Sequence, residues 1–175
     1  MELVAEVLKY MIPAVLVLIT IRLLQDDRKK ESAAQHIRQM QGEIMRQHLP
    51  VKLTAYERAI LFLERISPEN LLPRVNGAGK PSDQFHLELV RDIRNEFEHN
   101  LAQQLYISPE GWAALVHAKE QVLALINQAA KQMTAEDDGI SMSRKIIESY
   151  SQMGDLPTHK ATFVLKSDIQ KLFKV

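Results

Sequence analysis

The chain contains no cysteine, and its formal net charge is zero, with 22 basic and 22 acidic side chains. The first absence excludes disulfide bonds, thiol catalysis and zinc sites built on thiolates, and it suits a cytoplasmic domain. The charge balance argues against nucleic acid as the main partner, because phosphate binding needs clustered excess positive charge. Several function classes are therefore removed by composition alone.

The sequence also lacks the motifs of several enzyme classes. The loop Asn76-Gly77-Ala78-Gly79-Lys80-Pro81 lacks the GK[ST] ending of a phosphate loop, and we predict no strand before it. No Ser lies in a nucleophile elbow. Glu96-x-x-His99 resembles half of a di-metal bundle site, but no second copy occurs, so only a symmetric dimer could complete it. We expect no enzymatic activity, no cofactor and no resident metal.

A long apolar run lies near the N-terminus. No charged residue occurs between Lys9 and Arg22. A transmembrane helix needs about 20 predominantly apolar residues, and residues 3–24 provide them with their charged side chains towards the two ends. We predict that residues 1–25 form a transmembrane anchor.

The same run could also belong to a signal peptide, an interfacial helix or a buried core helix. A cleaved signal peptide should begin with basic residues, whereas the chain begins Met1-Glu2. An interfacial helix should have one polar face, which residues 11–21 lack. A buried core helix, in a bundle or an oligomer, remains an alternative.

Basic residues follow the apolar run. Arg28, Lys29 and Lys30 stand on its C-terminal side, and Lys9 is the one basic residue on its N-terminal side. The positive-inside rule then predicts a single-pass protein with its N-terminus outside and its C-terminal domain in the cytoplasm. We expect the three clustered basic residues to contact anionic lipid headgroups of the bilayer.

Residues 26–50 are polar, and their few apolar residues step by four, three and four: Ala33, Ile37, Met40 and Ile44. This is heptad spacing over barely two heptads. We predict a juxtamembrane stalk helix that continues from the anchor and ends at Pro50. Two interpretations stay open, a self-associating stalk and a solvated helix with one modest packing stripe.

Residues 51–175 show the periodicity of a cytoplasmic helical bundle of about four to five helices, so the fold class is all-α. The predicted helices cover residues 53–66, 82–105, 108–133 and 141–153. The segment 158–174 is also interpreted as a helix, with a strand as the alternative for its HKATFVL part.

The strongest helical pattern is an apolar residue at every fourth position, which predicts one buried stripe: Phe85, Leu89, Ile93, Phe97, Leu101 and Leu105. The tetrapeptide Ile-Ser-Pro-Glu occurs twice, at 66–69 and 107–110. Each copy predicts a helix start, with Ser67 or Ser108 as the N-cap and proline at the first helical position.

One short stretch suggests chemistry. Arg94-Asn95 followed by His99 resembles the R-x4-H pattern of HEPN-type ribonucleases, helical bundles in which paired subunits cleave RNA. The resemblance implies that Arg94 stabilises the phosphate, Asn95 positions substrate and His99 acts as acid or base. Residues five apart on a regular helix point about 140° apart, which opposes this interpretation. The alternative is an ion pair between Arg94 and Glu98 on a solvated face.

Three blocks of the chain resemble an uncharacterised family of bacterial single-pass helical proteins: residues 7–14, 55–72 and 93–108. The resemblance implies the topology described above, in the bacterial inner membrane, and no activity.

From these observations we expect a non-catalytic accessory or scaffold subunit of a larger membrane complex, whose partners are other membrane protein subunits. A membrane-tethered ribonuclease and a self-assembling structural protein, a homo-oligomer, are the alternatives. Polar residues beside the apolar stripes either form interhelical ion pairs or present a partner surface. The candidates for that surface are Glu57, Arg58, Arg94, Glu98, His99, Gln103 and Gln104.

Overall fold

The computed structural model of the chain describes residues 22, 40, 42–43 and 47–173. Apart from Arg22, the predicted anchor at residues 1–25 lies outside this set, and so do Arg28, Lys29 and Lys30. Among the residues that are described, no helix has both the length and the apolar character needed to cross a membrane.

The chain divides into two units, Met1–Leu49 and Pro50–Val175. The described part of the second unit contains helices and no β-strand, so the predicted all-α class is confirmed. Its first helical segment, residues 50–66, is called helix 50–66 below. The others are α2 (Pro68–Val75), α3 (Ser82–Asn100), the 3₁₀ helix η1 (Leu101–Leu105), α4 (Pro109–Ala130), α5 (Gly139–Ser151) and α6 (Pro157–Phe173).

Two features of the helices differ from the prediction, and one open alternative is decided. The described unit has six α-helices where four to five were expected, because the short α2 is separate. Residues 47–66 are all helical, so Pro50 does not end a helix. Its fixed φ of about −65° is itself helical. The segment from Pro157 is a helix, as preferred over a strand.

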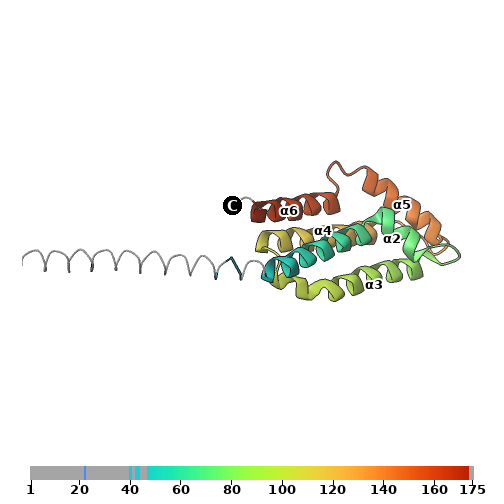
Figure 1. Cartoon of the computed structure of the whole chain (residues 1–175). Helices are drawn as coiled ribbons and strands as arrows, with labels where there is room; N and C mark the ends of the chain where they lie inside the picture. The colour runs from blue at the N-terminus through green and yellow to red at the C-terminus, as the bar shows by residue number, and fades with distance from the viewer. Residues whose placement is uncertain (1–21, 23–39, 41, 44–46, 174–175) are drawn as a thin grey trace, which may run out of the picture. The chain divides into compact units, whose positions relative to one another are not determined.

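Helix α4 is the centre of the bundle. It contacts α3, α5 and α6, while α2 packs against α3 and α5. Figure 1 shows α6 on one side of α4 and α3 on the other, with helix 50–66 between them. Helix 50–66 is joined to α3 through the rings of Phe62 and Phe97, whose centroids lie 5.9 Å apart.

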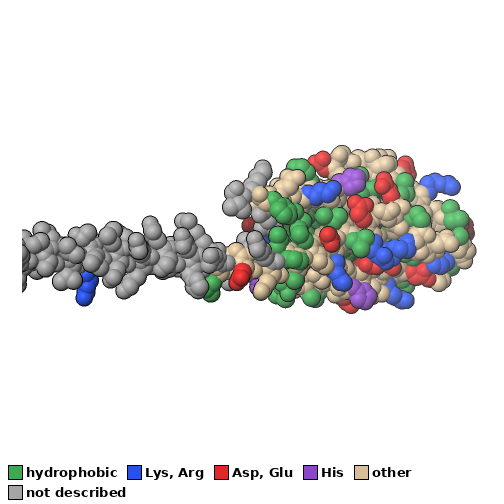
Figure 2. Space-filling model, viewed as in Figure 1, with side chains coloured by type: hydrophobic (Ala, Val, Ile, Leu, Met, Phe, Trp, Pro, Cys, Tyr) green, Lys and Arg blue, Asp and Glu red, His purple; other side chains and the backbone are tan. Residues whose placement is uncertain are grey.

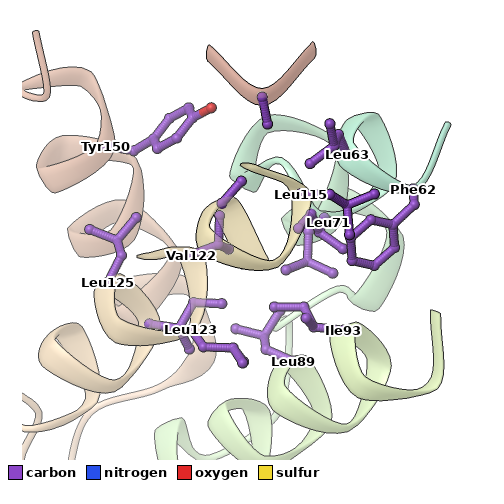
Figure 3. Close-up of a cluster of buried hydrophobic side chains, with 14 of the residues drawn as sticks. Phe62, Leu63, Leu71, Leu89, Ile93, Leu115, Val122, Leu123, Leu125 and Tyr150 are labelled. Atoms are coloured by element: carbon purple, nitrogen blue, oxygen red, sulfur yellow. The ribbon is translucent and has the colours of Figure 1, made fainter. Parts of the chain in front are cut away.

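The core is apolar because each helix turns one stripe of its 3.6-residue period inward. Phe85, Leu89 and Ile93 of the predicted α3 stripe are fully buried. Figure 3 shows Leu89 and Ile93 facing Leu123 of α4, with Leu71 close by. Burying such side chains contributes about 1.5–3 kcal/mol each, so this contact stabilises the bundle substantially.

Two loops meet backbone to backbone at the end of the bundle away from residue 50. Gly77, between α2 and α3, touches Gly139 at the start of α5, and both glycines are buried. The amide of Gly139 donates to the carbonyl of Lys80 at 2.9 Å, and the amide of Ser82 donates to the carbonyl of Asp137 at 3.1 Å. A Cβ on Gly139 would lie 2.5 Å from the Gly77 carbonyl oxygen, so no larger residue fits here.

The two Ile-Ser-Pro-Glu copies behave differently. Ser108 caps α4, because its Oγ accepts a hydrogen bond from the amide of Gly111 at 2.9 Å. Ser67 makes no side-chain cap. Instead its own amide donates to the carbonyl of Leu63 at 3.1 Å, so the preceding helix bends directly into α2. Both copies therefore begin a helix with serine at the N-cap and proline at the first helical position, as predicted, but only Ser108 caps its helix through its side chain.

Candidate functional site

The predicted interaction residues lie on the outside of the bundle. Glu57 and Arg58 are exposed on helix 50–66, and Arg94, Glu98 and His99 are exposed on α3. Gln104 of η1 is exposed, while Gln103 is half-buried. In this unit the seven candidates are therefore available as a surface, but they do not converge on a cavity.

Helix α3 ends five residues earlier than predicted. The side-chain amide of Asn100 donates to the carbonyl of Glu96 at 2.7 Å, and the chain then tightens into η1. A 3₁₀ helix has about 3.0 residues per turn, so side chains beyond Asn100 leave the stripe set by the 3.6-residue period. The predicted continuous stripe to Leu105 is wrong for this reason.

This change of period turns apolar side chains outward. Leu101 is 43% exposed, Leu105 is 78% exposed and Tyr106 is 40% exposed. We call these three residues the η1 patch. Figure 2 shows hydrophobic side chains gathered at the end of the bundle where helix 50–66 begins, while the middle of this face carries mixed charges. Three large apolar side chains left exposed within six consecutive residues make this segment a candidate interaction site.

A buried polar node fixes the chain just after the η1 patch. The amide of Ser108 donates to the hydroxyl of Tyr56 at 3.1 Å, which joins the start of α4 to helix 50–66. The Ser108 hydroxyl donates to the carboxylate of Asp168 on α6, which also accepts from Nζ of Lys171 at 3.0 Å. The patch therefore lies next to a hydrogen-bonded junction of helix 50–66, α4 and α6.

Asp168 is buried yet charged. Burial raises its pKa, but the hydrogen bonds from Ser108 and Lys171, with the positive charges of Lys171 and Lys52, outweigh that effect and hold the pKa below its usual range. The carboxylate also lies at the N-terminus of α4, where the helix dipole favours negative charge. The absence of a side chain at Gly111 lets the Asp168 carboxylate approach this closely, because a Cβ at that position would lie 3.0 Å from Asp168 Oδ2.

Helix α3 carries ion pairs whose particular partners we did not predict from the sequence. Its acidic residues at every fourth position each pair with a basic residue from an earlier segment: Glu88 with Lys80, Asp92 with Arg74, and Glu96 with Arg65. Arg74 also donates to the carbonyl of Arg65 at 3.0 Å, so it joins α2 to helix 50–66 and α3. In the sequence, these ion pairs could have been anticipated from the acidic residues that repeat along one face of α3.

The predicted ribonuclease residues are not brought together by the fold. Helix α3 is regular from Ser82 to Asn100. The side chains of Arg94 and His99 therefore project about 140° apart and cannot meet at one phosphate within a chain. Asn95 is exposed between them. Among the described residues no ion pair joins Arg94 to Glu98 within 4.0 Å, so that predicted pair is wrong as well.

The described region also holds no group of three or more His, Asp or Glu side chains able to bind a metal ion. Glu96, half of the suggested di-metal unit, is paired with Arg65. A shallow apolar groove of about 490 Å³ lies between α2 and α5, lined by Leu72 and Ile147 with Arg144 among the lining residues. It resembles a contact surface more than a reaction site.

Fold and surface together define this chain as an all-α bundle protein with an exposed apolar patch and no converging catalytic groups in its described part. It belongs to the Family of unknown function (DUF7935), which matches residues 2–172. No curated protein and no solved structure matches the chain. The predicted membership of an uncharacterised family is thereby confirmed, and the family covers the N-terminal run as well as the bundle.

Proposed function

We propose that this protein is a non-catalytic, membrane-anchored scaffold or accessory subunit that binds another membrane protein through the η1 patch. The observation that carries the proposal is the exposure of Leu101, Leu105 and Tyr106 next to a hydrogen-bonded junction of helices. A protein interface places apolar and aromatic side chains at its centre and polar groups around them. Gln104 on η1 and His99 at the end of α3 supply such a rim.

The anchor belongs to the same proposal. Residues 1–25 hold the chain in the bacterial inner membrane with the N-terminus outside, residues 26–50 form the stalk, and the bundle lies in the cytoplasm. The apolar run and the basic residues Arg28, Lys29 and Lys30 support this orientation, with the basic side chains on lipid headgroups. The zero net charge of the chain supports a protein partner over nucleic acid.

The test is affinity purification of the full-length protein from its own membranes in mild detergent, comparing two variants. Leu105→Glu puts a charge at the most exposed residue of the patch, which is 78% exposed. Phe163→Glu makes the same change at a residue of α6 that is 74% exposed and lies outside the patch.

We expect wild type and Phe163→Glu to recover the same stoichiometric membrane partner, and Leu105→Glu to lose it by about tenfold or more, as for a charge placed in an interface centre. Recovery of the partner at equal yield with Leu105→Glu would contradict the patch as the binding site. Recovery of wild type alone would contradict the accessory role.

A further inference from the structure

We propose that a second copy of this chain docks in parallel against the outer face of helix 50–66. Four of the exposed residues of this helix follow one stripe, in steps of three, four and three: Val51, Thr54, Arg58 and Leu61. Two of them are large apolar side chains left open to solvent, Val51 at 45% and Leu61 at 57%. Figure 1 shows helix 50–66 on the outside of the bundle, with none of the labelled helices drawn over it.

The sequence spacing of this stripe continues a heptad pattern. Val51 follows Ile37 and Ile44 at intervals of seven residues, and Leu61 follows Met40 at three times that interval. Met40 is itself 55% exposed. Apolar residues sustained in one heptad register are the sequence requirement for helices that pair side by side. The solvated-helix interpretation does not account for the register that Met40, Val51 and Leu61 share, since each is a large apolar residue and each is exposed.

Charge identifies the occupant as a second copy. Arg58 stands at the first core position of its heptad, and Glu57 stands at the flanking position just before it. In a parallel pair of identical helices these positions face each other across the axis, so each Arg58 meets the partner copy's carboxylate at position 57. Neither residue makes an ion pair within the described part of its own chain.

The polar core positions also select the geometry. Polar residues at heptad core positions fix register and oligomeric state at some cost in stability, and here Thr54 and Arg58 occupy two of them. The parallel orientation rests on the proposed anchoring, because copies held in one membrane point the same way.

The chain has no cysteine, so a single introduced cysteine is the only site at which two copies can form a disulfide. Such variants of the full-length protein therefore report how close the chosen position lies to its equivalent in a second copy. Leu61→Cys is compared with Leu87→Cys, which replaces the same residue type at matched exposure, 57% against 61%, on α3. Both variants are oxidised in native membranes and separated without reductant. We expect a disulfide-linked dimer for Leu61→Cys at about fivefold or more the yield of Leu87→Cys, because a disulfide forms only where Cα atoms approach within about 7 Å.

The charge arrangement is tested in the Leu61→Cys background. Glu57→Arg and Arg58→Glu each place like charges across the axis and should lower the dimer yield about three- to tenfold, while the double variant restores it. Both residues are exposed, so these changes leave the bundle folded, which the fluorescence of Trp112 verifies.

Equal cross-linking at positions 61 and 87 would overturn the proposal, and so would a double variant that fails to restore the dimer. Anchoring is scored on the same membranes by carbonate extraction. Release of the chain into the supernatant would refute the anchor, whereas the ratio between the two cysteine variants decides the dimer.

Discussion

Replacing Gly139 with alanine should destabilise the bundle severely, although alanine is normally the better helix former. The added Cβ would lie 2.5 Å from the carbonyl oxygen of Gly77 and 2.8 Å from its Cα. Both contacts are with backbone, so no side chain can rotate away. The loop before α3 and the start of α5 must separate for the methyl group to fit.

The size of the destabilisation follows from the free-energy cost of separating these two segments. Overpacking in a close-packed site costs about 1–3 kcal/mol. The two hydrogen bonds across the contact, from Gly139 to Lys80 and from Ser82 to Asp137, contribute about 0.5–1.5 kcal/mol each. If one of them is lost, the free energy of unfolding falls by about 2–4 kcal/mol.

The assay is urea unfolding of the full-length protein in mild detergent, followed by the fluorescence of Trp112, the one tryptophan of the chain. With a denaturant slope of about 1–3 kcal/mol per molar, the midpoint should fall by about 1–2 M. Gly154→Ala is the control, because a Cβ there meets nothing within 4 Å. Equal midpoints for the two variants would refute the reasoning from close backbone contact.

Two further predictions concern polar contacts. Asp168→Asn should lower the free energy of unfolding at pH 7 by about 1.5–3 kcal/mol, because the hydrogen bond from Ser108 loses its charged acceptor. The pKa of Asp168 is depressed in the fold, so its stabilisation is present above the ordinary carboxyl pKa of about 4 and is lost as the pH falls below it. Urea titrations between pH 7 and pH 3 should show this loss in wild type and a weaker one in the variant; parallel curves would contradict it. Arg74→Lys should cost about 1 kcal/mol in the same assay at pH 7, because one ammonium group does not reproduce the two guanidinium nitrogens that bind Oδ1 of Asp92 and the carbonyl of Arg65. An unchanged midpoint would show that these contacts contribute little.

The helices themselves could be predicted from local pattern. Phe85, Leu89 and Ile93 recur at the helical period, and all three are buried as expected. In the last segment Ala161 and Leu165 follow the same rule, and the segment is a helix in spite of its β-branched residues. A 3.6-residue period can be recognised within a short stretch of sequence, so a helix can be predicted without knowing what it packs against.

The ends of helices could not be predicted this way. Two identical tetrapeptides both begin a helix, but the serine side chain caps the helix only at Ser108 and makes no cap hydrogen bond at Ser67. The difference lies in partners remote in sequence, since Ser108 bonds to Tyr56, 52 residues away, and to Asp168, 60 residues away. The same node places the η1 patch on the surface, where the period alone predicted burial of Leu105.

The candidate surface, too, could be predicted only in part from the sequence. The sequence by itself determined that this is an all-α chain, and it picked out the polar residues Glu57 and Arg58 that lie on the exposed face of helix 50–66. Only the tertiary structure decided which apolar residues remain uncovered. Exposure depends on which helices pack together, and packing is set by contacts between residues far apart in the chain.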